Sequence, residues 1–134
     1  MKWLKRAGLA VLLLPAVLIA AFVGYEALGM CVNHAAARCQ TEQLQSRLRQ
    51  ELSDAVVKEA YSETGNTTGT GNHVDCLSTV IFSTSVPEEE LKSKLSQYYD
   101  FSDEQYCCLQ KTAEGEYLFY LNTSAPFADN LEGH

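Results

Sequence analysis

The sequence lacks the motifs that mark common catalytic and cofactor-binding sites. It contains no Gly-x-Ser-x-Gly element, no Cys-x-x-Cys pair, and no Lys-Ser/Thr at the end of its glycine-rich stretch 65–72. Its three histidines, at positions 34, 73 and 134, lie in a predicted stalk, a predicted loop and the C-terminal tail. We therefore expect a protein that is not an enzyme and that holds no cofactor and no metal.

Positive charge is also scarce after the first 31 residues. That part of the chain has 7 Lys and Arg against 16 Asp and Glu, a formal charge near −9. A nucleic acid requires a basic surface, so we do not expect one as a partner. The acidic surface suits a soluble domain outside the cytoplasm, and we predict a protein partner for it.

A long uncharged segment is present at the N-terminal end. Ala7 to Tyr25 are 19 residues without a charge, bounded by Lys5-Arg6 and by Glu26. As a helix this segment is about 28 Å long, close to the ~30 Å hydrocarbon core of a bilayer. The basic residues before it favour a cytoplasmic N-terminus. We therefore predict that residues 1–30 are a membrane anchor or signal segment. The protein would then cross the membrane once, with its C-terminal domain outside the cytoplasm.

Two alternatives involve cleavage of this segment. Ala27-Leu28-Gly29 matches a signal-peptidase site, which would give a secreted protein, although the apolar run exceeds the usual length of roughly 7–15 residues. Leu28-Gly29-Met30-Cys31 resembles the lipobox of bacterial lipoproteins, with Cys31 as the lipidated residue. Met30 departs from that pattern, which has a small residue at this position. All three interpretations place the domain in the same compartment.

The five cysteines are an odd number, and outside the cytoplasm most of them are expected to pair. We predict disulfides among Cys39, Cys76, Cys107 and Cys108, with Cys76 joined to Cys107 or Cys108. Closing that loop stabilises by roughly 3–4 kcal/mol on the chain-entropy model. Cys31 is then left for lipidation, a free thiol or an intermolecular bond. The alternative is a thiol-based redox protein or sensor that uses Cys107 and Cys108 with Cys76, which requires a lowered thiol pKa.

Hydrophobic spacing predicts an amphipathic helix over about 35–61, within a stalk that we assign to residues 31–62. Its apolar stripe has three- and four-residue spacings and consists of Ala37, Thr41, Leu44, Leu48, Leu52, Ala55 and Val56. Gly65 is a natural stop. The stretch 65–72 then indicates a flexible loop.

An α+β domain is predicted over residues 63–126. A β-branched strand at 76–86 is followed by a helix that starts at Pro87 and ends near Asp100. Strands at 105–112 and 117–123 form a hairpin, in which a two-residue Glu114-Gly115 turn would place Thr112 opposite Tyr117. The elements follow in the order strand, helix and hairpin. Their strands form a small antiparallel sheet that packs on helices. Residues 127–134 are expected to be a flexible tail.

Aromatic residues crowd the C-terminal third of the chain. Tyrosines near a sheet edge often form protein-binding surfaces. We predict such an interaction face from Tyr98, Tyr99, Tyr117 and Tyr120.

The order of an apolar N-terminal helix, an amphipathic helix and a sheet is similar in layout to pilin-like assembly subunits. Those proteins carry a leader-peptidase site with a Glu soon after the cut, and this chain does not, because Glu26 lies beyond the apolar run. The resemblance is one of architecture. We expect a membrane-tethered, extracytoplasmic protein-interaction or assembly module.

Overall fold

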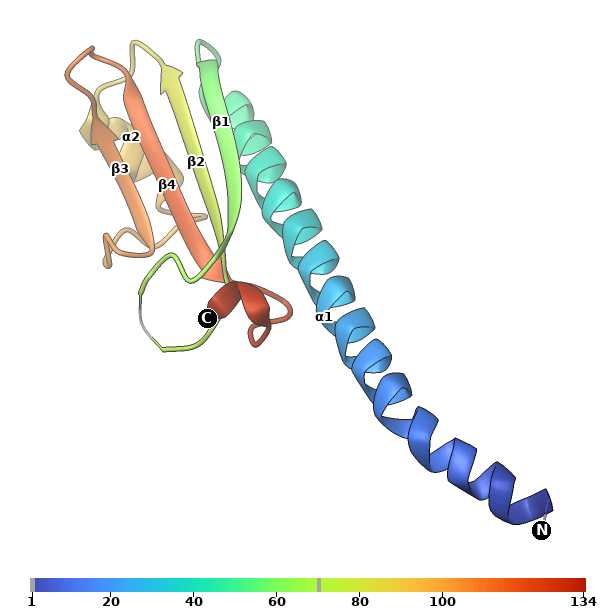
Figure 1. Ribbon diagram of the computed structural model, residues 1–134. Coiled ribbons are helices and arrows are strands. Elements are labelled where there is room, and N and C mark those ends of the chain that lie inside the picture. The colour runs from blue at the N-terminus through green and yellow to red at the C-terminus, as the bar shows by residue number, and fades with distance from the viewer. Residues whose placement is uncertain (1, 70) are drawn as a thin grey trace.

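The computed structural model describes residues 2–69 and 71–134, with side chains described for residue 8 and from residue 11 onward except residue 70. The described elements are α1 (Lys2–Glu51), β1 (Val56–Gly65), β2 (Asp75–Ser83), α2 (Glu88–Leu95), β3 (Cys107–Lys111), β4 (Tyr117–Ser124) and the short 3₁₀ helix η1 (Leu131–Gly133). The C-terminal half of α1 lies against the sheet, and its N-terminal half projects away from it (Figure 1).

Helix α1 is one unbroken helix of 50 residues. The large apolar side chains of its projecting half, from Val11 to Leu28, are all more than half exposed. Among the described residues, this is the one helix that is long and apolar enough to cross a membrane, by length and composition. The predicted apolar anchor is therefore a helix that suits either a signal anchor or a membrane span.

The C-terminal half of α1 packs on the sheet through Leu44 and Leu48, and Leu52 continues this row directly after the helix; all three are fully buried. Their four-residue spacing confirms the predicted helix face up to this point. The helix ends at Glu51, however, and not near residue 61. Residues 56–65 form β1 instead, because pairing with β2 stabilises this β-branched stretch more than the helical spacing does.

The sheet has four antiparallel strands in the order β1-β2-β4-β3. Both α1 and α2 cover the same face, where they enclose the core around Val80, Phe82 and Phe119. An α+β fold with helices against a small antiparallel sheet is thus confirmed, with four strands where the sequence predicted three. The predicted boundary between residues 62 and 63 falls inside β1. No helix of the described residues covers the opposite face of the sheet (Figure 1).

The β3–β4 hairpin has a register one residue away from the predicted one. Lys111 pairs with Tyr117 and Cys107 pairs with Leu121. The connection is longer than the expected two-residue turn, because Thr112 receives a hydrogen bond from the N–H of Gly115 and donates its own N–H to Glu116. As a consequence Cys107, and not Cys108, shares the core face with Phe119.

Candidate functional site

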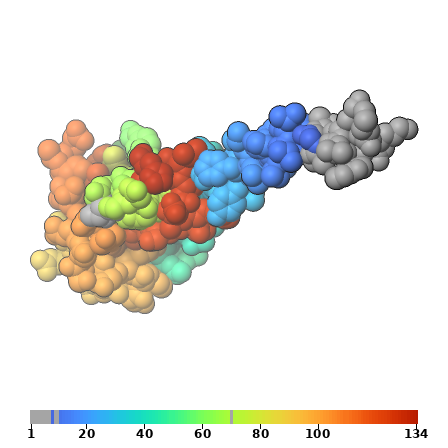
Figure 2. Space-filling model, turned by 60° about the horizontal axis from the view of Figure 1, so that its bottom comes forward, coloured from blue at the N-terminus to red at the C-terminus, as the bar shows by residue number. Residues whose placement is uncertain are grey.

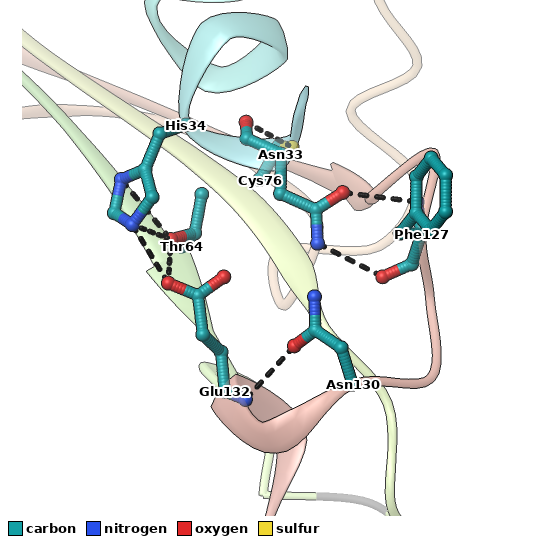
Figure 3. Close-up of polar contacts among 7 residues, drawn as sticks. All are labelled: Asn33, His34, Thr64, Cys76, Phe127, Asn130 and Glu132. Carbon is teal, nitrogen blue, oxygen red and sulfur yellow. Dashed lines mark hydrogen bonds and ion pairs between the residues drawn. The ribbon is translucent and has the colours of Figure 1, made fainter. Parts of the chain in front are cut away.

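Among the described residues, the hydrogen bonds of longest sequence separation lie where α1 leaves the globular domain. Here α1 residues Glu26, Gly29, Asn33 and His34 contact the C-terminal segment at Phe127, Asn130, Leu131 and Glu132, and we call this set the clasp. Figure 3 shows five of these residues, Asn33, His34, Phe127, Asn130 and Glu132. The segment 127–134 was predicted to be a flexible tail. Its described residues are docked on α1.

Asn33 is the centre of the clasp and is fully buried. Its Nδ2 donates to the carbonyl of Phe127 at 2.8 Å, and its Oδ1 accepts the N–H of Phe127 at 2.9 Å. One side-chain amide therefore satisfies both backbone groups of one residue, as a neighbouring strand would. No other neutral side chain has a donor and an acceptor in this planar arrangement apart from Gln, which is longer.

Glu26 and Gly29 hold the same segment nearer to the projecting half of α1. The Glu26 carboxylate accepts the N–H of Leu131 at 3.0 Å, and the side chain is only 8% exposed. Gly29 allows close approach, since a Cβ at this position would lie 3.2 Å from the Phe127 ring. The rings of Tyr25 and Phe127 meet edge to face at 5.8 Å. The C-terminal segment is thus bound along about three turns of α1.

Glu132 joins the clasp to the sheet. Its Oε1 lies 2.7 Å from His34 Nε2 and accepts the hydroxyl of Thr64 in β1 at 3.1 Å (Figure 3). The N–H of Glu132 is bound in turn by Asn130 at 2.8 Å. One side chain therefore links α1, β1 and η1.

Asp75, at the start of β2, orders the neighbouring loop. It is 2% exposed and accepts hydrogen bonds from the Thr67 hydroxyl and from the N–H of Thr68, while His73 lies 2.8 Å away. Burial alone would raise the pKa of Asp75, but these hydrogen bonds and the histidine outweigh it, and the pKa lies below its ordinary value. The glycine-rich stretch, predicted to be flexible, is attached at these residues.

None of the described cysteines forms a disulfide. The predicted bond from Cys76 to Cys107 or Cys108 is not seen, because β4 lies between β2 and β3. Two strand spacings are roughly 9.6 Å, whereas a disulfide needs Cα atoms about 4.4–6.8 Å apart. Cys31 and Cys39 are exposed on α1.

The thiols of the proposed redox site have raised pKa values. Burial raises the pKa of Cys76 and Cys108, and it raises that of Cys107 to about 11. A redox-active cysteine requires the opposite shift. These three thiols therefore have the properties of structural cysteines.

The four tyrosines of the predicted interaction face do not share one surface. Tyr98 and Tyr99 lie together, and Tyr98 lies under the guanidinium of Arg47 at 4.0 Å. Tyr117 is buried in the core and donates to the carbonyl of Val86. Tyr120 pairs with Thr79, on the side of the sheet opposite to the helices.

The uncovered side of the sheet is a second candidate surface, which we call the open face. The strand registers place the alternate, outward side chains of three strands on it. These are Glu59, Tyr61 and Glu63 of β1, Leu77, Thr79 and Ile81 of β2, and Leu118 and Tyr120 of β4. The sequence pattern did not indicate this surface, because the first part of β1, up to residue 61, was predicted to be helical.

A third feature is a row of exposed residues on α1. Cys31, Ala35, Arg38, Glu42 and Arg49 have helical spacing, and we call them the arginine stripe. Among the described residues, neither Arg38 nor Arg49 has a carboxylate within ion-pair distance. Arg49 donates a hydrogen bond to the exposed Gln45 side chain at 3.3 Å, so neither arginine has its charge neutralised by an ion pair among these residues.

No protein-family model, no curated protein and no solved structure matches this chain. The described residues also include no group of three or more His, Cys, Asp and Glu side chains arranged to hold a metal ion. A functional argument therefore depends on the clasp, the open face and the arginine stripe.

Proposed function

We propose that this chain is a non-enzymatic assembly module, anchored in a membrane by α1 with its C-terminal domain outside the cytoplasm. Its partner is a further copy of the same chain. The observation that carries the proposal is the continuity of α1, which runs from the exposed apolar half into the core without a break. The layout also keeps the architectural similarity to pilin-like assembly subunits.

The clasp supports a permanent anchor over a cleaved signal or a lipoprotein. Cleavage after Gly29 or before Cys31 would remove Tyr25, Glu26 and Gly29 from the domain. All three contact the C-terminal segment. Because cleavage would break these contacts, they favour an N-terminal segment that stays attached to the domain.

Charge complementarity supports contact between copies. The open face carries the carboxylates of Glu59 and Glu63, and the stripe of α1 carries Arg38 and Arg49. The two arginines are about 16 Å apart along the helix and the two glutamates about 13 Å apart along the strand, so two ion pairs are within reach of these long side chains. Without such ion pairs, the acidic surfaces of two neighbouring copies would repel one another.

The common anchor sets the copies in register. Every copy crosses the membrane through the same helix, so equivalent residues stand at one height above the bilayer. The packed half of α1 lies alongside the sheet (Figure 1), and the stripe of one copy therefore stands level with the open face of the next. Such a contact joins two different surfaces, and it repeats as a row or closes as a ring.

A charge-swap experiment tests this proposal on the full-length chain in liposomes. We expect Arg38→Glu with Arg49→Glu to weaken self-association, and Glu59→Arg with Glu63→Arg to do the same. Two exposed ion pairs at about 0.7 kcal/mol each correspond to roughly tenfold in the dissociation constant. Mixing the two variants should restore association, as measured by energy transfer between labelled copies.

The matched control reverses exposed acids elsewhere, with Glu89→Arg and Glu114→Arg. A chain that stays monomeric at every surface density, or one in which this control weakens association equally, would contradict the proposal. Burial of the thiols disfavours the redox alternative, which predicts rapid alkylation of Cys107 in the native protein.

A further inference from the structure

We propose that the C-terminal segment forms a second contact with the membrane, beside the helix that crosses it. The contact surface consists of Phe22 and Tyr25 of α1 with Phe127 and Leu131, and we call it the floor. It would bind the headgroup region of a zwitterionic bilayer. This inference rests on the proposed membrane span of α1.

The position of the floor follows from the clasp. The uncharged run of α1 ends at Tyr25, and the next residue, Glu26, binds the N–H of Leu131. If residues 7–25 occupy the bilayer, Leu131 is held at the level where the helix leaves it. Figure 2 shows the C-terminal segment at the end of the globular part from which the apolar half of α1 emerges.

Three apolar side chains of the floor are largely exposed, and one of them, Tyr25, also packs against the Phe127 ring. Leu131 is 59% exposed, Phe22 56% and Tyr25 55%. These side chains line one hollow between α1 and η1. Tyrosine at the end of an apolar span is the usual side chain at a membrane interface, where its ring is partly apolar and its hydroxyl remains hydrated.

Several backbone groups of the floor already have hydrogen-bond partners, which favours contact with a less polar environment. The N–H and C=O of Phe127 are bound by Asn33, and the N–H of Leu131 is bound by Glu26. Backbone groups without a partner would make insertion costly. The clasp therefore lowers the cost of placing this segment against lipid.

Charge selects the kind of lipid. Asp129 is highly exposed and lies beside the floor, and Glu26 and Glu132 are close behind it. Carboxylates at this level are repelled by anionic headgroups. A phosphatidylcholine surface presents no net charge to them, and it is the probe used below.

Tryptophan quenching by brominated phosphatidylcholine tests the floor in the full-length chain. Replacing Trp3 by Phe removes the single native tryptophan. Leu131→Trp then reports on the floor, Val17→Trp on the proposed span, and Val56→Trp on an exposed apolar position at the far end of the domain. The Leu131 contact to α1 uses its backbone N–H, so an exposed tryptophan side chain leaves that contact in place.

We expect Leu131→Trp to be quenched at least about half as strongly as Val17→Trp, because interfacial side chains meet the upper acyl chain. Val56→Trp should not be quenched. Quenching at Val17→Trp without quenching at Leu131→Trp would overturn the floor and leave the anchor intact. Absence of quenching at Val17→Trp would overturn the proposed span itself, and the floor with it.

Discussion

Removal of the Asn33 side chain tests the clasp most directly. Asn33→Ala deletes both hydrogen bonds to Phe127 and leaves the part-buried N–H and C=O of that residue without these partners. Each unsatisfied group costs about 1–3 kcal/mol, so the expected loss for the two groups is roughly 2–6 kcal/mol. That is a substantial fraction of the free energy of unfolding of a typical domain, about 5–15 kcal/mol.

The loss should be local to the clasp, because Asn33 does not belong to the main core around Phe82. Hydrogen exchange, measured by mass spectrometry on the full-length chain in detergent micelles, distinguishes local opening of the clasp from unfolding of the main core. Amides of 127–132 should exchange at least about thirtyfold faster, which corresponds to 2 kcal/mol, while those of β2 and β4 stay protected.

The matched control is Asn72→Ala, at an exposed asparagine outside the clasp. It should leave the exchange of 127–132 unchanged. If Asn33→Ala behaves like this control, the side chain does not hold the segment, and our account of the clasp is wrong. If β2 and β4 lose protection together with 127–132, the clasp and the main core unfold as one unit.

Three further predictions follow from separate parts of the structure. Gly133→Ala should lower the melting temperature, because a Cβ there would lie 2.9 Å from a backbone carbon of His73. Such overpacking costs about 1–3 kcal/mol. An unchanged melting temperature would show that η1 is free to shift. Hydrogen bonds, chiefly from Ser85 and also from Thr84, hold the pKa of Asp54 well below its ordinary value of 3.8. The ionised carboxylate therefore stabilises the fold above the unfolded pKa. This stabilisation is lost as the pH falls below about 4 toward the folded pKa. Asp54→Asn should therefore flatten the acid limb of stability measured against pH, and an unaltered limb would contradict this. In the native chain a thiol reagent should modify the exposed Cys31 well before the buried Cys107, and equal rates, read by mass spectrometry, would contradict the observed burial.

The main features of the helices could be predicted from local patterns. Leu44, Leu48 and Leu52 have the spacing of a helix face, and Pro87 before three glutamates correctly indicates the start of α2. The strand β1 could not be separated from the helix in this way. Ala55 and Val56 continue the helical spacing, and only pairing with β2, which is not local in the sequence, determines the outcome.

The clasp had no sequence signal. Asn33 and Phe127 are 94 residues apart, and an asparagine just before a predicted helix indicates nothing about a distant backbone. The charges of Glu26 and Glu132 were visible, but their partners were not. The hairpin was located correctly and its register was off by one, because the length of a turn depends on hydrogen bonds such as those of Thr112.

The 94-residue separation within the clasp also constrains the order in which the molecule is completed. During synthesis, Asn33 emerges long before Phe127, and the whole sheet is produced between them. Until Phe127 arrives, the side chain of Asn33 and the carboxylate of Glu26 lack their partners. The junction between helix and domain therefore closes as a late step, after the intervening chain has emerged.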